Sequence, residues 1–470
     1  MALQQSIHAK QTATDTIAAI ATPLNASGLG IVRLSGPACL GIMRQVFRPA
    51  GTEPHKKIRS HIATPGMIRT AHHVLDQAMA LYMKAPKSFT GEDMVEFTTH
   101  GSPLVLKNIL SLLIERGARI AEPGEFTKRA YLNGKMDLAQ AEAVAELIRA
   151  KTDAAARTAV EQLTGNLSRE IKILKNTLIE IKVQLEVRLD YPEEDIDAYH
   201  LDSVIQQCDA LAHTLRNLIT SSVRGYALSQ GVRCAIIGKP NVGKSSLLNA
   251  LLQTDRAIVT DEPGTTRDVI DAEFVLHDTV VRIVDTAGIR SHAFSRAEHL
   301  GIERSRKATH DADLILAVFD QSMPVTDDDR MVLNCVEQKP WIGVLNKSDT
   351  AHPVHAHELA DLLSNASVVP ISALTNDGID RLREAIGQIL TINLPPIESS
   401  VIITNVRHET VLKRALRSVE RATQSARERK SEECIVFEIN EALTAFDEIT
   451  GATTNEDILE RIFAEFCIGK

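Results

Sequence analysis

The chain has 470 residues and a mass of 51.5 kDa, more than one hydrophobic core usually serves, so we expect about three domains. Hydrophobic residues make up 44% and charged residues 24%, which excludes the disordered and fibrous classes. A net charge of -9 argues against a protein that coats nucleic acid through an overall positive field, although a local basic patch is compatible with it.

Cysteine usage and hydropathy bear on the cellular compartment. The six cysteines are scattered without a CxxC pair, so the sequence indicates neither a disulfide framework nor a zinc site. The first residues contain no apolar core of a signal peptide, and no uninterrupted apolar run reaches the roughly 18 residues of a membrane span. We therefore predict a cytoplasmic protein without a membrane segment.

Four regions follow one another along the chain. Residues 1–125 alternate short apolar runs with turn signals, which predicts a small α+β domain. Residues 126–230 are rich in Ala and Leu with helical periodicity, interrupted at Tyr191–Asp195 by a proline and a run of acidic residues. Residues 231–391 alternate apolar strands with polar helices, which predicts a parallel α/β sheet. Helical patterns return in 392–470, and these helices complete the bundle begun before residue 231.

The segment GKPNVGKS lies between the strand VRCAII and the helix SLLNALL, the context that a phosphate-binding loop requires. Glycines such as Gly238 and Gly243 let the main chain curl, so that its N–H groups face phosphate oxygens. Lys244 supplies positive charge at the β- and γ-phosphates, and Ser245 presents a hydroxyl to Mg²⁺.

Three further strand ends carry nucleotide motifs in order. Asp285 of DTAG is suited to the magnesium shell, and Gly288 to a main-chain contact with the γ-phosphate. Asp349 of NKSD can accept two hydrogen bonds from guanine, which adenine cannot offer, so the sequence predicts selection of GTP. Ser372 opens SAL, placed to give a main-chain N–H to the guanine oxygen. The ordered set resembles translation-factor-type GTPases.

The predicted fold is thus an α/β P-loop GTPase (Ras-like) domain inserted into an all-α helical domain, preceded by an α+β amino-terminal domain. The predicted GTP-binding residues, which come from all these motifs, are Asn241, Val242, Gly243, Lys244, Ser245, Ser246, Thr260, Thr265, Thr266, Asp285, Thr286, Ala287, Gly288, Asn346, Lys347, Asp349, Ser372, Ala373 and Leu374.

The hydrolytic site departs from the Ras pattern. A Ras-like site orients water with a glutamine after the DTAG glycine, but Ile289 stands there, and an aliphatic side chain cannot align water. Either another residue positions the nucleophile or hydrolysis awaits a partner. Thr266 is the second expected Mg²⁺ ligand, after Ser245. Asn241 either braces the loop or helps to hold a large monovalent cation beside the phosphates, and the residues alone do not choose between these.

The flanking segments carry a more specific resemblance. DTIAAIATP, GIVRLSG, SFTGEDMVEF, PGEFTKRAYLNGKMDLAQAEAV and the final FCIGK closely resemble the MnmE (TrmE) family of tRNA-modification GTPases, over essentially the whole chain. The resemblance implies an enzyme that acts with MnmG (GidA), which uses FAD and NADH. The product is an aminomethyl or carboxymethylaminomethyl group on carbon 5 of wobble uridine 34 in tRNA.

The resemblance also implies the ligands. The one-carbon unit comes from 5,10-methylenetetrahydrofolate, for which 5-formyltetrahydrofolate is a bound analogue, and the folate contacts carry over to Arg33, Glu96, Lys135 and Lys470. Family members dimerise through the amino-terminal domain, form a heterotetramer of two plus two with MnmG, and hydrolyse GTP when potassium is bound. The implied potassium ligands are Asn241, Thr260, Glu262 and Thr265.

Two catalytic assignments beyond Lys244 rest on the same resemblance. Glu298 matches the family's catalytic glutamate, which works through bridging water, whereas Glu303 keeps the ordinary role of an exposed carboxylate. Cys467, four residues from the end of the sequence, matches a thiol implicated in the modification, although a structural role is nearly as compatible with its position.

Two alternatives to a tRNA-modifying enzyme stay open. A ribosome-assembly or RNA-docking GTPase switch would need an RNA-binding appendage, and no GXXG-bearing module is visible. A scaffold with a vestigial site is disfavoured because Lys244, Ser245, Asp285 and Asp349 are intact.

Overall fold

The structure is a computed structural model that describes residues 15–51, 58–190, 199–253, 272–284, 309–336, 339–350, 363, 367–392 and 401–470. It divides into two compact units. The first consists of Met1–Ile148, Val160–Glu194 and Glu432–Lys470, and the second of Arg149–Ala159 and Asp195–Ser431. The four regions predicted from the sequence stay a prediction, because compactness divides the chain differently.

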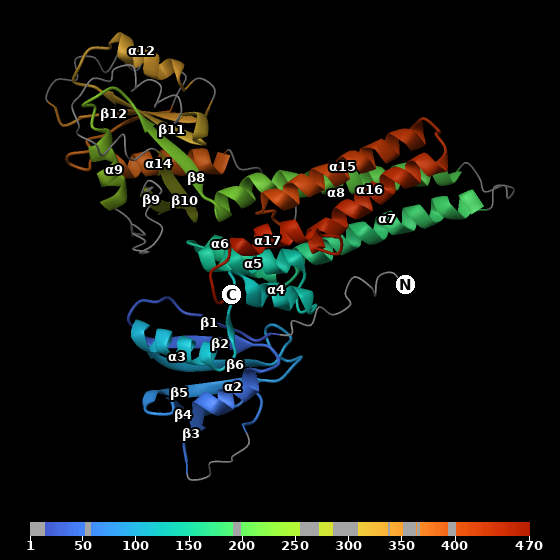
Figure 1. The fold of residues 1–470 in the computed structure, drawn as a ribbon. Coiled ribbons are helices and arrows are strands. Elements are labelled where there is room, and N and C mark those ends of the chain that lie inside the picture. The colour runs from blue at the N-terminus through green and yellow to red at the C-terminus, as the bar shows by residue number, and fades with distance from the viewer. Residues whose placement is uncertain are drawn as a thin grey trace. The chain divides into compact units, whose positions relative to one another are not determined.

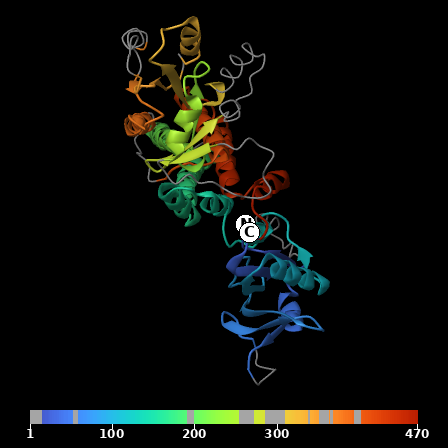
Figure 2. The same ribbon diagram turned by 90° about the vertical axis from the view of Figure 1, so that its left-hand side faces the viewer.

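The first unit begins with a seven-stranded sheet in the order β3-β4-β5-β6-β2-β1-β7. Neighbouring strands run antiparallel, except that β1 and β7 are parallel. Helices α2 and α3 lie on the same side of the sheet in both views (Figures 1 and 2). The elements are β1 (Ile17–Ile20), β2 (Ser27–Ser35), α2 (Cys39–Val46), β3 (Phe47–Pro49), β4 (Ala63–Arg69), β5 (Val74–Met83), β6 (Met94–Gly101), α3 (Pro103–Glu115) and β7 (Arg119–Ile120).

Strand alternation gives this sheet two different faces. Val32 and Leu34 of β2 point into the core beneath α2 and α3, so Arg33 between them points to the opposite face. That second face carries a smaller apolar cluster, which includes Ile17 of β1 and Phe126. The charged side chain of Arg33 therefore lies on a sheet face that apolar side chains partly cover.

The helices of the first unit pair across long sequence distances. Helix α16 packs on α7, and α17 packs on α4, as predicted for carboxy-terminal helices that complete an earlier bundle. Figure 1 shows α7 and α16 side by side. The bounds are α4 (Glu125–Leu132), α5 (Leu138–Arg149), α6 (Asp153–Leu163), α7 (Asn166–Asp190), α16 (Glu432–Thr450) and α17 (Glu456–Ala464), with α6 divided between the two units.

A buried ion cluster anchors α4 to the sheet. Glu125, 8% exposed, accepts from Arg119 Nη2 at 2.7 Å and from Arg129 Nη2 at 2.9 Å. Arg129, 5% exposed, also contacts Asp15 Oδ1 at 2.8 Å and Glu92 Oε2 at 3.1 Å. Burial opposes ionisation of Glu125, but the hydrogen bonds from Arg119, the Glu122 main-chain N–H and Arg129 hold its pKa below the usual range. The GEFTKR segment therefore has a structural role, because its Glu125 and Arg129 connect α4 to neighbouring segments through ion pairs.

The second unit contains a six-stranded sheet in the order β13-β12-β11-β8-β10-β9, with α9 and α14 packed on one face. The prediction of a parallel sheet is correct except at β9, which is antiparallel to β10 because the tight turn His277–Asp278 joins the two. The elements are β8 (Val232–Ile237), α9 (Lys244–Gln253), β9 (Ala272–Leu276), β10 (Thr279–Val284), β11 (Leu314–Asp320), α12 (Asp327–Asn334), β12 (Trp341–Asn346), β13 (Ser367–Pro370) and α14 (Ile379–Ile392).

A helical pair belongs to the same unit. Helix α8 (Tyr199–Ser229) packs along α15 (Val406–Arg427), as Figure 1 shows. Near the end of α8 the main chain of Ile403 comes so close that a Cβ on Gly225 would lie 1.9 Å from the Ile403 carbonyl oxygen. Only glycine permits this approach. No helix in the described part of the chain is long and apolar enough to cross a membrane.

The ion cluster generates a prediction on acid stability. A carboxylate with a depressed folded-state pKa contributes stability above its unfolded pKa of about 4.3 and loses it as the pH falls through the folded value. Glu125→Gln should therefore destabilise the protein by roughly 2–3 kcal/mol at pH 7, with Asp15 and Glu92 still facing Arg129. The difference from the wild type should shrink steadily below about pH 4, measured as the midpoint of urea unfolding by far-UV circular dichroism.

Glu122→Gln is the matched control, because the Glu122 side chain is exposed three residues away. It should change stability by less than about 0.5 kcal/mol at either pH. A loss in Glu125→Gln that stays constant between pH 7 and pH 3.5 would contradict the proposed role of the charge.

Candidate active site

The predicted phosphate-binding loop joins β8 to α9 and has an irregular main chain. Gly238, Asn241 and Gly243 have φ values of 151°, 64° and 97°, so three residues in this short loop lie in the left-handed half of conformational space. A Cβ on Gly243 would lie 2.2 Å from Nδ2 of Asn346. Glycine is therefore required there by conformation and by space.

Lys244 folds its side chain back over this loop. Its Nζ donates to the carbonyl oxygens of Gly238 and Lys239, each at 2.8 Å. Burial lowers the pKa of this ammonium group. A partly buried cation held by neutral carbonyl groups keeps its positive charge available for an anion, as binding to a phosphate requires.

Asn346, at the end of β12, ties the phosphate loop to the guanine-side loop. Its Nδ2 donates to the Val242 carbonyl oxygen at 2.7 Å, and its Oδ1 accepts from the main-chain N–H of Ala373 at 3.0 Å. The side chain is 3% exposed. One buried amide thus joins three motifs that are separate in sequence.

The residues predicted to read guanine gather beside it. Ser372 Oγ donates to Asp349 Oδ1 at 2.6 Å, and the Ser348 main-chain N–H donates to the Ile371 carbonyl oxygen at 3.0 Å. Leu374, in the same loop, is 81% exposed. The Asp349 carboxylate is oriented by a hydroxyl from SAL, which leaves its second oxygen for a donor on the base.

Two ion pairs at this site involve acidic residues that the sequence motifs did not single out. Lys347 Nζ contacts Asp320 Oδ2 at 2.6 Å, and Lys239 Nζ contacts Asp329 Oδ2 at 2.8 Å. Burial opposes ionisation of Asp320, but the hydrogen bonds from Lys347 and Ser322 lower its pKa. Asp320 ends β11, and this position at a strand end could have indicated it. Asp329 is in the first turn of a helix, where the Thr326–Asp329 spacing indicates a capping box but no nucleotide motif.

Part of the predicted site lies outside the described residues. This applies to the predicted cation ligands that follow the phosphate loop, the DTAG motif and the predicted catalytic glutamate, which are Thr260, Glu262, Thr265, Thr266, Asp285, Thr286, Ala287, Gly288 and Glu298. Their roles stay predictions. Val284, the last residue of β10, immediately precedes Asp285.

A second predicted site, for folate, lies in the first unit. Arg33 and Glu96 are directly opposed on β2 and β6, with Nη2 of Arg33 and Oε1 of Glu96 at 3.0 Å. The guanidinium lies 5.4 Å from the centre of the Phe126 ring, and Nη1 donates to the Gly469 carbonyl oxygen at 3.0 Å. Burial and the charge of Arg33 lower the pKa of Lys470. The structure therefore brings three of the four predicted folate residues together, and we call this group the tail pocket.

The tail pocket has one buried donor that is not satisfied. Burial lowers the pKa of Arg33 and of Lys470, and Glu96 is the side-chain carboxylate near both. Nε of Arg33 is buried and has no hydrogen-bond partner in the part of the chain that the structure describes. This donor, with Lys470 nearby, is suited to a ligand that accepts hydrogen bonds.

Main-chain contacts hold the tail against α4. The Phe126 N–H donates to the Lys470 oxygen at 3.2 Å, and the Gly124 N–H to the Cys467 oxygen at 3.5 Å. Cys467 is exposed, as its predicted role in chemistry requires. Lys135, the fourth predicted folate residue, donates from Nζ to the Pro86 carbonyl oxygen at 3.1 Å.

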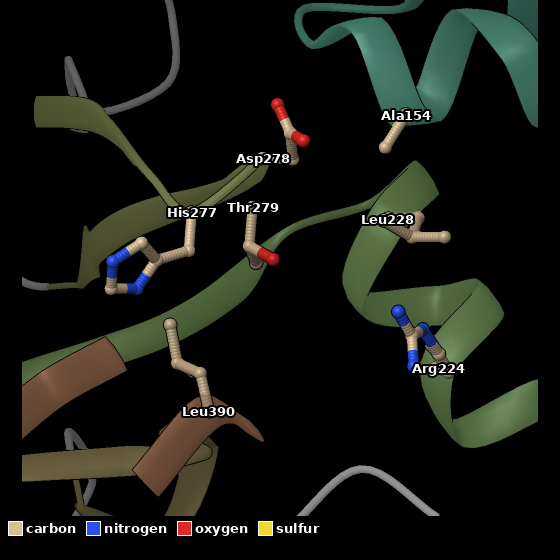
Figure 3. A pocket seen from close by; sticks show the side chains of 7 residues that line it. All are labelled: Ala154, Arg224, Leu228, His277, Asp278, Thr279 and Leu390. Carbon is tan, nitrogen blue, oxygen red and sulfur yellow. The ribbon is translucent and has the colours of Figure 1, made fainter. Parts of the chain in front are cut away.

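A cavity of about 160 Å³ in the second unit lies elsewhere. Figure 3 shows Arg224 and Leu228 of α8 opposite His277 and Thr279 of the β9–β10 hairpin. No residue of the phosphate loop, NKSD or SAL lines this cavity. It is therefore separate from the nucleotide site.

Comparison with known proteins identifies the family. The model of the MnmE helical domain matches residues 138–467, and that of the GTP-binding protein TrmE N-terminus matches residues 16–135. The tRNA modification GTPase MnmE of Aquifex aeolicus is 43% identical over 458 residues, which cover 97% of this chain and 100% of that protein. The same enzyme of Acetivibrio thermocellus is 40% identical over 458 residues, covering 97% and 99%.

The G domain of the FeoB iron transporter from Thermotoga maritima is a solved structure that is 28% identical, covers 33% of this chain and 97% of that chain, and has a TM-score of 0.26. Residues matched over nearly the full length of both chains decide the matter: this chain belongs to the MnmE family of tRNA modification GTPases.

Proposed function

We propose that this chain hydrolyses GTP at the phosphate loop in order to drive a modification of carbon 5 of wobble uridine 34 in tRNA. The group added is carboxymethylaminomethyl or aminomethyl, and MnmG is the partner enzyme. The observation that carries the proposal is that one chain of this family combines a loop built for phosphate with a separate cationic pocket closed by its own tail. A simple nucleotide switch would need only the first.

At the nucleotide site each residue has its own proposed role. Lys244 neutralises charge on the β- and γ-phosphates, and the curled main chain from Gly238 to Gly243 presents N–H groups to their oxygens. Asp349 accepts from the guanine N1–H and amino group. Water then adds to the γ-phosphorus while the bond to the β–γ bridging oxygen breaks, and GDP and phosphate leave. Glu298 orients that water in place of the missing glutamine.

Two metal ions belong to the proposed reaction. Ser245, in the first turn of α9, supplies a hydroxyl oxygen, the kind of ligand that Mg²⁺ accepts, and Thr266 is the second proposed ligand. Asn241 is exposed in the phosphate loop and carries an amide oxygen suited to K⁺. The other proposed potassium ligands are Thr260, Glu262 and Thr265. Mg²⁺ and K⁺ would both stabilise charge that develops on the phosphates.

The tail pocket is proposed to bind 5,10-methylenetetrahydrofolate or its 5-formyl analogue. The buried Arg33 Nε needs an acceptor, and the Arg33 and Lys470 side chains supply charged donors for the carboxylates of a folate. Glu96 can accept from N–H groups of a pterin ring. Lys135, at the Pro86 carbonyl, is proposed as a contact from the rim of the pocket.

The remaining parts of the proposal concern the tail thiol and the partners. The role proposed for Cys467 is in the modification; the exposure of its thiol and the main-chain contact with Gly124 support this proposal. We propose a cytoplasmic homodimer that joins MnmG in a heterotetramer of two plus two, with FAD and NADH bound by MnmG.

Nucleotide selection gives the first test. Asp349→Asn should weaken GTP binding about 100-fold, because two hydrogen bonds to a charged acceptor are lost, and should improve binding of xanthosine triphosphate. Isothermal titration with Mg²⁺ present measures both. Asp377→Asn, the same change at an exposed position near the SAL loop, should leave both affinities unchanged. Equal GTP binding by Asp349→Asn would exclude the proposed guanine contact.

The tail pocket gives the second test. Lys470→Gln should weaken binding of 5-formyltetrahydrofolate about 10-fold, since one charge-assisted hydrogen bond is lost. Lys128→Gln on α4 removes a lysine from the same unit and should have no effect. GTP hydrolysis, located in the other unit, should be unaffected in both. Failure of the wild type to bind this folate would overturn the assignment of the ligand.

The reaction itself is tested in cells that lack this chain. Their tRNA should contain unmodified uridine at position 34, by nucleoside mass spectrometry. The wild type should restore the modification, and Lys244→Ala, which removes the phosphate-binding charge, should not. Normal wobble modification together with a defect in ribosomal subunits would instead favour an RNA-docking switch.

A further inference from the structure

The second residue of the phosphate loop has a fixed side chain. The P-loop pattern allows any residue type at the position of Lys239. Here its ammonium group lies 2.8 Å from Asp329 Oδ2, and the two side chains are only 15% and 3% exposed. An ion pair this well covered is held more firmly than the exposed lysine expected of a loop.

The carboxylate that receives Lys239 is itself immobilised. Asp329 stands in the first turn of α12, where its Oδ2 also accepts from the main-chain N–H of Thr326 at 3.0 Å and from the Thr326 hydroxyl at 2.8 Å. This capping box fixes the position of the carboxylate at the start of the helix. Asp329 is therefore a rigid anchor on a neighbouring element.

The main chain of Lys239 leads directly to the phosphate-binding lysine. The Lys239 carbonyl oxygen is one of the two that accept from Lys244 Nζ, at 2.8 Å. The loop has no regular hydrogen-bond ladder across its left-handed positions, so other contacts must fix it. Asn346 fixes its far end at Val242, and the Lys239–Asp329 ion pair fixes its near end.

We propose that Lys239 is a positioning residue for GTP binding, which acts by holding the first part of the phosphate loop against α12. It touches no reacting atom. It lowers the entropic cost of ordering the loop around the phosphates, because the loop is already held in place before the nucleotide arrives. The inference rests on the proposed nucleotide site and adds to it a residue at an unspecified position of the phosphate-loop motif, together with an acidic anchor that lies outside the four GTPase motifs.

The test compares four variants of the full chain. Lys239→Met removes the charge but keeps the length of the side chain. It should raise the Kd for GDP and for a non-hydrolysable GTP analogue roughly 10-fold, as with other outer contacts that orient a binding group. The KM for GTP should rise in parallel, with kcat changed little. Lys239→Arg keeps the ion pair and should restore most of the affinity.

Lys339→Met is the matched control. Lys339 is a partly buried lysine of the same unit, and its Nζ donates to the Ala312 carbonyl oxygen at 2.7 Å, away from the phosphate loop. It should leave nucleotide affinity unchanged even if thermal unfolding shows a similar loss of stability. Adding Asp329→Asn to Lys239→Met should weaken binding no further, because the two residues act as one unit.

The outcomes separate this inference from the nucleotide site itself. A wild type that does not bind GTP would refute the site. A wild type that binds, with Lys239→Met binding equally well, would refute the positioning role alone. The role would also be refuted if Lys239→Met and Lys339→Met weakened binding equally, in step with lost stability, or if Lys239→Arg failed to restore binding.

Discussion

The amide of Asn346 is the contact on which the nucleotide site depends. A phosphate loop and a base-reading loop can bind one molecule only if the distance between them is fixed, and here one buried side chain donates to the first and accepts from the second. The carboxamide offers a donor and an acceptor at once, which neither a carboxylate nor an ammonium group can do. Gly243 makes room for this amide, because any side chain at that position would displace it.

The tail pocket depends on a different constraint, the closure of the first unit by residues from both ends of the chain. Arg33 and Gly469 are 436 positions apart in sequence yet share a hydrogen bond. Gly469 has a φ of 93°, and a Cβ there would lie 2.5 Å from the Ile20 carbonyl oxygen, so the tail fits against β1 only as glycine. The tail pocket therefore depends on contacts with α4, because α17 packs on α4 and the Phe126 N–H donates to the Lys470 oxygen.

Much of this could be predicted from the sequence, for definite reasons. The strands before GKPNVGKS, NKSD and SAL are continuous apolar runs bounded by turn residues, so their type and order were readable. The pairing of Arg33 with Glu96 depends on the register between β2 and β6. The alternation of apolar and polar residues along each strand does not determine that register. The antiparallel β9 was missed because His277–Asp278 is not a typical hairpin turn sequence, yet both residues adopt positive φ. The contact between Asp329 and Lys239 could not be predicted, because helix-capping aspartates are common and nothing in the sequence links one of them to Lys239.

The contacts of lysine and arginine side chains distinguish residues with a structural role from residues suited to bind a ligand. Arg119, Arg129, Lys239 and Lys347 each contact a carboxylate, so their charge is already neutralised and what they supply is geometry. Lys244 contacts only carbonyl oxygens among the described residues, and burial lowers its pKa. A buried cation without a carboxylate partner is costly to keep unless an anion arrives, and that cost favours the proposed contact between Lys244 and the phosphates of GTP.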